Sequence, residues 1–127
     1  MAVPYRTDKQ IEDEYAKAYA KYQAVQQAQA DRQKQHKDTE YDDIQRQGYV
    51  QYMQNKKELP GYLANLGVVG GGSETTALRA DTNYQTGHQA TEKRRDADKT
   101  AIDNTLTDIL NQYKMVADEN MRKEKQQ

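Results

Sequence analysis

The chain lacks cysteine altogether, which excludes disulfide bridges and thiolate metal sites. Its two histidines are too few for an imidazole cluster, so we expect neither a metal nor a cofactor. Leucine, isoleucine, valine and phenylalanine together number only 16 of 127 residues, a share typical of disordered chains. A chain with so little apolar material is either unfolded or completes its core by association, with copies of itself or with a larger partner.

Other features of the composition favour order over disorder. The formal net charge is only −1, so there is little self-repulsion to keep the chain expanded. Sixteen glutamines and 14 alanines are good helix formers, and the only two prolines, Pro4 and Pro60, lie outside the long periodic stretches. We therefore expect an all-α protein.

Secretory and membrane signals are weak or missing in this sequence. Residues 1–6 do not show the basic and then apolar pattern of a signal peptide. No apolar run approaches the length of a transmembrane helix. We expect a protein that no signal peptide exports and that has no membrane partner.

The first half of the chain predicts a long helix over about residues 7–57. Thr7 or Asp8 is a suitable N-cap, and the residue before Pro60 is biased away from helical backbone angles. Apolar residues recur at alternating steps of four and three, the spacing of a coiled-coil seam, at Ile11, Tyr15, Ala18, Tyr22 and Val25. After a polar stretch, burial is expected to resume at Tyr41, Ile44, Tyr49, Val50, Tyr52 and Met53.

The second half predicts another helix over about residues 73–121. Ser73 is a good N-cap, and Glu74 is placed favourably against the positive end of the helix dipole. Residues 122–127 are expected to fray. The apolar end of this helix is supplied by Ile102, Leu106, Ile109, Leu110, Tyr113, Val116 and Met121.

Folding the chain back at its glycine-rich middle pairs apolar with apolar and polar with polar blocks. The matching register joins residues whose numbers sum to about 130, so that Tyr22 meets Ile109 and Tyr15 meets Val116. We therefore predict one domain, an elongated antiparallel helical hairpin that resembles a coiled coil. A single continuous helix is the main alternative, and a chain with disordered arms is the other. The predicted seam comprises Ile11, Tyr15, Tyr22, Ile102, Ile109 and Val116.

Residues 58–72 are the predicted connecting tip. Pro60 suits the first turn of a short helix, with Gly67 as its left-handed terminator. Five apolar side chains crowd this end of a narrow rod, where they either seal the hairpin or form a docking surface for a partner. They are Tyr62, Leu63, Leu66, Val68 and Val69.

The polar middle of each predicted helix carries charges of both signs. Lys93, Arg94 and Arg95 are the densest basic run, but neighbouring carboxylates would repel phosphates, so nucleic acid is not an expected partner. No serine, histidine and aspartate arrangement with hydrolase spacing is present, and the paired carboxylates lie on heavily charged helices. We do not expect an enzyme.

The central segment carries a pattern of glycine, an aliphatic residue, a glycine pair, a Ser-Glu helix start and a downstream Asn-Tyr. These features are residues 66–75, Asn83 with Tyr84, and a charged stretch with Arg95 and Asp96. The pattern resembles small helical proteins encoded among the structural genes of bacteriophages and prophages of Gram-positive bacteria. The resemblance covers the central third of the chain and implies a virion component.

The resemblance leads to two hypotheses of function. The first is a multi-copy structural protein of the virion that binds copies of itself and other virion proteins at a neck, tail or baseplate. Ten tyrosines suit such a role, because a tyrosine offers apolar area and tolerates a wet interface. The second is a transient scaffold or chaperone in the host cytoplasm, or a protein packaged in the head and ejected with the genome. A coiled-coil adaptor without a phage connection is a third.

Overall fold

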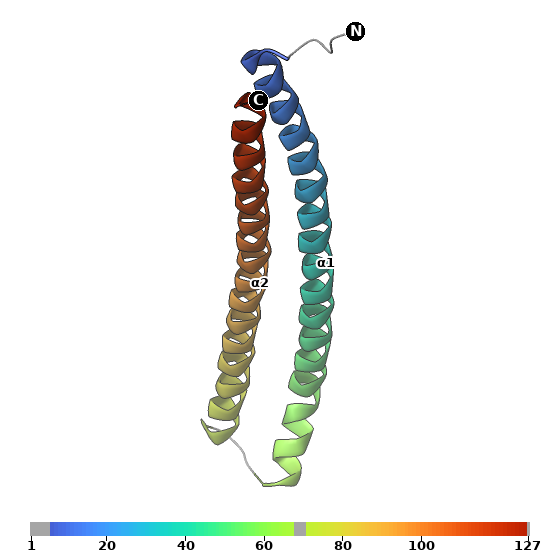
Figure 1. Cartoon of the computed structure of the whole chain (residues 1–127). Helices are drawn as coiled ribbons and strands as arrows, with labels where there is room; N and C mark the ends of the chain where they lie inside the picture. Colours follow the sequence, from blue (N-terminus) through green and yellow to red (C-terminus); the bar gives the residue numbers. More distant parts are fainter. Residues whose placement is uncertain (1–5, 68–70, 127) are drawn as a thin grey trace. The chain divides into compact units, whose positions relative to one another are not determined.

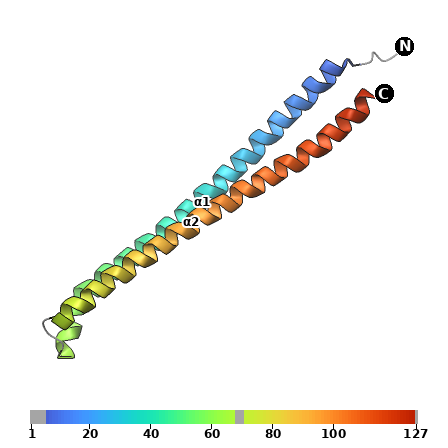
Figure 2. The ribbon, with the colours of Figure 1, turned by 90° about the vertical axis from the view of Figure 1, so that its left-hand side faces the viewer.

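The computed structural model contains two long α-helices that pack against each other as an all-α helical hairpin (Figure 1). Helix α1 spans Asp8–Asn65 and helix α2 spans Gly71–Lys125. The two helices run in opposite directions, as a second view also shows (Figure 2). The structure describes residues 6–67 and 71–126, without the side chains of residues 71–73. The predicted fold class is confirmed.

The hairpin divides into two compact units, each built from a part of both helices. The terminal unit comprises Met1–Lys34 and Thr100–Gln127, and the central unit comprises Gln35–Lys99. The sequence suggested alternating polar and apolar blocks, but it did not suggest this division.

Helix α1 begins with a reciprocal capping arrangement. The Thr7 hydroxyl accepts a hydrogen bond from the backbone N–H of Gln10 at 3.1 Å. The Gln10 side chain in turn accepts one from the backbone N–H of Thr7 at 2.9 Å. This Thr-x-x-Gln capping box satisfies two N–H groups that a helix start otherwise leaves unpaired, and it confirms Thr7 as the cap.

Helix α1 ends eight residues later than predicted. The expected end near residue 57 is wrong, because the helix continues through Pro60 to Asn65. Proline removes one backbone donor, yet its fixed φ is helical, so the hydrogen bonds on either side of it carry the helix onward. The predicted left-handed terminator is confirmed, since Gly67 has a φ of 76° and its N–H donates to the Ala64 carbonyl.

Helix α2 is longer than predicted at both ends. It starts at Gly71 rather than near residue 73, and it runs to Lys125, so the expected frayed tail is wrong over residues 122–125. Several ion pairs hold this last turn. Arg122 donates to Glu119 within α2 at 2.7 Å, and Lys125 donates to Glu12 of α1 at 2.6 Å.

The inward side chains recur every 11 residues and do not follow the predicted heptad. Val25 is 61% exposed and Ala18 is exposed, whereas Tyr19 and Gln26 turn inward. A repeat of 11 residues in three turns is closer to the natural period of an α-helix than a heptad is, so the stripe requires little distortion. The clearest series are Tyr19, Ala30, Tyr41, Tyr52 and Leu63 in α1, and Tyr84, Arg95, Leu106 and Ala117 in α2.

Polar contacts between the helices fix a register that differs from the predicted one. In the terminal unit Lys34 pairs with Asp103 and Glu12 with Lys125. The residue numbers of both pairs sum to 137, not to about 130. The same sum recurs in the central unit, in Asp38 with Lys99, Asp42 with Arg95, Gln45 with Glu92, and Lys56 with Asp81.

The displacement from the predicted register has a simple cause. A shift of seven residues is nearly two helical turns, so it leaves the same helix faces in contact. Apolar patterning therefore supports both registers equally well. The charges select between them, because the observed alignment pairs Asp38 with Lys99, whereas the predicted one would set Asp38 opposite Glu92 and Lys37 opposite Lys93.

The hydrophobic core of the hairpin is thin. Among the described side chains, only Ile11, Ala30, Leu63 and Leu106 are buried. The chain exposes 9969 Å² of surface. A compact monomer of 14.6 kDa would expose roughly 6,900 Å², so this chain exposes about 3,000 Å² more than a compact protein of its mass.

Candidate interaction surface

The predicted seam residues lie mostly, but not all, between the helices. Ile11 is 4% exposed, and the side chains of Tyr15, Tyr22, Ile102 and Ile109 are half-buried. Val116 does not belong to the seam, because it is 62% exposed. The heptad spacing placed it inward, whereas the observed repeat places Tyr113 and Ala117 there.

The predicted burial of six residues in the central unit is only partly correct. Tyr41 and Tyr52 are half-buried as predicted. The other four face solvent, because the inward stripe passes through positions 41, 45 and 52 instead. They are Ile44, Tyr49, Val50 and Met53, with exposures of 53%, 50%, 49% and 44%.

Each unit contains one stacked tyrosine pair that bridges the helices. In the terminal unit the rings of Tyr22 and Tyr113 are 4.2 Å apart and inclined by 12°. In the central unit Tyr52 and Tyr84 are 4.3 Å apart and inclined by 15°. The predicted partner of Tyr22 was Ile109, so the ring pair is a finding of the structure. Stacking lets these rings fill the interhelical space while their hydroxyls stay near water.

The Tyr52 hydroxyl belongs to a small charged cluster in the central unit. It donates a hydrogen bond to Asp81, and the Lys56 ammonium lies 3.5 Å from the same carboxylate. The hydrogen bond from Tyr52 lowers the pKa of Asp81, and Lys56 contributes in the same direction. The same bond raises the pKa of Tyr52, because ionised tyrosine would face a carboxylate.

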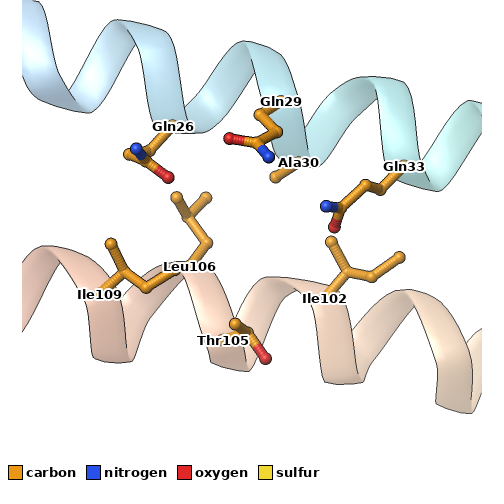
Figure 3. A pocket seen from close by; sticks show the side chains of 8 residues that line it. All are labelled: Gln26, Gln29, Ala30, Gln33, Ile102, Thr105, Leu106 and Ile109. Atoms are coloured by element: carbon orange, nitrogen blue, oxygen red, sulfur yellow. The ribbon is translucent and has the colours of Figure 1, made fainter.

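A groove in the terminal unit combines aliphatic side chains with glutamines (Figure 3). The glutamines and one alanine come from α1, and the aliphatic side chains and one threonine come from α2. The groove holds about 310 Å³ and is open to solvent. Its lining residues, none of them charged, are Gln26, Gln29, Ala30, Gln33, Ile102, Thr105, Leu106 and Ile109.

A second groove in the terminal unit is larger but has a charged rim. It holds about 630 Å³ over an apolar floor that includes Tyr15, Tyr19 and Met121. Glu12 and Asp118 stand at its edge, together with Lys114. Its lining combines apolar with charged side chains, as the apolar centre and polar rim of protein interfaces do, so this groove is also a candidate interaction surface.

A groove in the central unit has a polar rim of carboxamides. It lies over the Tyr52 and Tyr84 rings and holds about 750 Å³. The amides of Gln51, Asn55 and Asn83 border it. It can accept and donate hydrogen bonds, and its aliphatic lining residues are Leu59 and Ala80.

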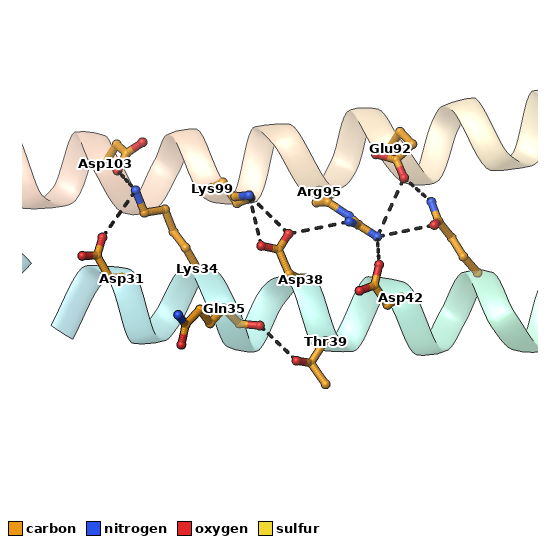
Figure 4. A network of polar contacts seen from close by, with 11 residues as sticks. Asp31, Lys34, Gln35, Asp38, Thr39, Asp42, Glu92, Arg95, Lys99 and Asp103 are labelled. Carbon is orange, nitrogen blue, oxygen red and sulfur yellow. Dashed lines mark hydrogen bonds and ion pairs between the residues drawn. The ribbon is translucent and has the colours of Figure 1, made fainter. Parts of the chain in front are cut away.

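Arg95 is the centre of an ion-pair network in the central unit (Figure 4). Its side chain is only 16% exposed and lies between carboxylates of both helices. It pairs with Asp42 at 2.7 Å, Asp38 at 3.6 Å and Glu92 at 3.8 Å. The hydrogen bond to Asp42 raises the pKa of Arg95 above its already high ordinary value.

The same network engages Lys99, whose ammonium lies 3.2 Å from Asp38. Tyr41 donates a hydrogen bond to Asp98, and this bond raises the pKa of Tyr41. The three basic residues 93–95, considered above as a possible contact for nucleic acid, therefore differ in environment. Arg95 is held between carboxylates, whereas Lys93 and Arg94 are exposed.

The predicted tip residues have different environments. Leu63 is 5% exposed and seals the hairpin, while Tyr62 is 61% and Leu66 60% exposed. Leu63 therefore fits the predicted cap, whereas Tyr62 and Leu66 have the exposure that a docking surface would need. Val68 and Val69 lie outside the described residues.

Within the residues that the structure describes, no group of three or more histidine and acidic side chains is arranged to hold a metal ion. His36 and His88 are both exposed. Neither described helix has a stretch apolar enough to cross a lipid bilayer.

Sequence reasoning missed several residues that make the interhelical contacts. Gln26 lies inward where apolar patterning placed Val25, and Arg95 lies inward although it is charged. The available signal was the 11-residue spacing of Tyr41 and Tyr52 and of Tyr84 and Arg95. Periodicity counted on apolar residues alone does not detect it, because inward positions are occupied by glutamine, lysine and arginine.

Comparison with protein families, with curated proteins and with solved structures finds no match.

Proposed function

We propose that the chain is a structural component of a bacteriophage particle, present in several copies and without enzymatic activity. The observation that carries its assembling role is the thin core. Obligate interfaces bury about 2,000–5,000 Å² over both partners, or about 1,000–2,500 Å² from each, so one such interface would cover much of the excess of about 3,000 Å². A hairpin of this kind gains its missing burial when copies or partners pack against it.

The virion setting rests on the resemblance of the central segment to small phage structural proteins. That segment covers residues 66–75 together with Asn83 and Tyr84. In this proposal the hairpin docks onto a symmetric neck, tail or baseplate in the host cytoplasm and remains in the finished virion. Among the tip residues that the structure describes, Tyr62 and Leu66 are exposed and available for docking, whereas Leu63 is buried in the hairpin.

Mass analysis of purified particles tests this proposal. A stoichiometric signal at a multiple that fits the particle's symmetry supports a structural component. Absence from mature particles, with presence in assembly intermediates, contradicts it and identifies a scaffold or chaperone. Loss of the protein when the genome leaves the head also contradicts it and identifies an ejected internal protein.

The docking role of the tip has its own test. Tyr62→Ser with Leu66→Ser is expected to weaken attachment to particles that lack the protein by roughly tenfold or more, because two exposed apolar contacts are removed. Met115→Ser with Val116→Ser is the matched control, since these residues are 72% and 62% exposed in the terminal unit. Equal loss in both double variants would contradict docking through the tip.

A further inference from the structure

The outer face of α1 in the central unit carries an uncharged apolar cluster. Residues 47–55 contain no charged side chain, although 31% of the chain is charged. Three large side chains of this run are about half exposed, namely Tyr49, Val50 and Met53. The inward side of the run is occupied by Tyr52, which stacks on Tyr84 of α2. About half of the surface of the three cluster residues therefore lies outside the contact between α1 and α2.

Charges on this outer face are placed symmetrically about Val50. Asp43 lies seven residues before it and Lys57 seven residues after it. Seven residues are nearly two helical turns, so each charge lies within about 20° of Val50 around α1 and about 10.5 Å from it along the axis. Both charged side chains are exposed. Asp43 pairs with Arg46 of its own helix at 3.3 Å, and Lys57 makes no ion pair within the part of the chain that the structure describes.

We propose that two copies of the chain associate through this face of α1, antiparallel, about a two-fold axis at Val50. Resting on the multi-copy function proposed above, this inference names the surface and its occupant. Asp43 of each copy then faces Lys57 of the other, so two ion pairs flank the apolar cluster. Charge complementarity identifies a second copy as the occupant, because a two-fold contact uses the same patch twice and the patch must match itself reversed.

The uncharged side chains of this face match under the same symmetry. At 100° per residue, Tyr49 and Met53 lie on one side of the line along the helix through Val50. Gln47 and Gln54 lie on the other side. A two-fold axis perpendicular to two antiparallel helices brings each side against its own copy. Apolar side chains therefore meet apolar ones, and amides, which are both donors and acceptors, meet amides.

Reversing the charges one at a time and then mixing the variants tests the proposed contact. Asp43→Lys alone sets two lysines against each other across the axis, and Lys57→Asp alone sets two aspartates. The dissociation constant of each variant is expected to rise by about tenfold or more at low ionic strength. An equimolar mixture restores both ion pairs between unlike copies, so its constant is expected to return to within about threefold of the unmodified value. Sedimentation of the full chain over a concentration series measures all three.

Lys93→Asp and Asp96→Lys are the matched controls. They make the same two charge reversals in the same unit, at exposed positions of α2. Neither side chain makes an ion pair among the described residues. Each control is expected to leave the dissociation constant within about twofold of that of the unmodified chain, because neither position lies on α1.

A single introduced thiol tests the position of the axis. The chain has no cysteine, so Val50→Cys supplies one thiol per copy, and the two thiols lie beside each other at the axis. Mild oxidation is expected to give a covalent dimer at least about fivefold faster than it does for Val25→Cys, because thiols held together in a complex react as if concentrated. Val25 is the matched control, since it is 61% exposed on the same helix but lies in the terminal unit.

Three results would overturn this inference. The first is a mixture of the two charge variants that associates no more tightly than either variant alone, and the second is an equal oxidation rate for the two thiol variants. The third is a chain that stays monomeric at all concentrations, including one that uses this face only for another particle protein. None of these removes the proposed function, because the copy number in purified particles decides that separately.

Discussion

The two units of the hairpin differ in the side chains at the middle of the contact between their helices. In the terminal unit, the contact around Leu106 is aliphatic and amide in character and contains an open groove. In the central unit, the contact around Arg95 is a network of ion pairs that engages both helices. Aliphatic burial supplies free energy but tolerates sliding by whole turns, whereas charge pairs supply little free energy and do not tolerate it. Aliphatic contacts therefore contribute mainly to the stability of the hairpin, and charge pairs mainly to the register of its helices.

The largest expected effect comes from Leu106→Ala. Leu106 is 9% exposed and belongs to the sparse core, so its truncation is expected to lower the free energy of unfolding by about 2–3 kcal/mol. Val116→Ala is the control, because this residue is 62% exposed although the heptad pattern placed it in the seam. Its expected effect is within about 0.5 kcal/mol. Denaturant unfolding followed by circular dichroism at one protein concentration measures both, and equal losses would restore the heptad seam.

A smaller effect is expected from Arg95→Ala. Removing this guanidinium leaves three carboxylates without their shared partner, and the expected loss is about 1–2 kcal/mol because those carboxylates are partly solvated. Arg94→Ala is the matched control, since Arg94 is exposed and makes no ion pair among the described residues. The control is expected to change stability by no more than about 0.5 kcal/mol. If the two variants were equally stable, the network would contribute nothing beyond a solvated surface.

The smallest effect is the pH dependence of the central unit. The pKa of Asp81 is lowered from 3.8, so its contribution is present above that value and is lost as pH falls through the lower folded pKa. The pKa values of Tyr41 and Tyr52 are raised from 10.0, so their contribution is present below pH 10.0 and is lost as pH rises through the higher folded values. The melting temperature is expected to be nearly constant from about pH 5 to about pH 9 and to decline on both sides.

Paired tyrosine variants isolate the alkaline side of this profile. Tyr41→Phe with Tyr52→Phe removes both hydroxyls and is expected to reduce the decline above about pH 10. Tyr49→Phe is the control, because this ring is half exposed and its hydroxyl makes no hydrogen bond among the described residues. An undiminished decline in the double variant would assign the alkaline loss to lysines instead.

Much of the fold was predictable from local signals. The Thr7 cap, the two helices and the left-handed Gly67 each follow from a residue type whose preference acts within one or two turns. The helix end near residue 57 was wrong because a proline inside a helix removes only one hydrogen bond, and the surrounding turns continue.

The register and the interaction surface were less predictable, for a physical reason. Apolar patterning identifies which face of a helix turns inward, but it is nearly unchanged by a shift of seven residues. The register was therefore left to charges such as Lys34 and Asp103, whose pairing across 69 residues has no local signature. An inward polar residue such as Gln26 cannot be told by its hydropathy from a residue on a solvent-exposed face.

Zero-length carbodiimide cross-linking of the unmodified chain tests the central claim most directly, because it joins lysines to carboxylates that are in contact. The i,i+3 pairs Lys34 with Asp31 and Lys37 with Glu40 serve as internal controls for reactivity. Mixing light and heavy isotope-labelled chains distinguishes links within a chain from links between copies. The account predicts links within one chain from Lys34 to Asp103 and from Lys99 to Asp38. Links from Lys34 to Asp96 and from Lys99 to Asp31 in their place, or links between copies alone, would contradict it.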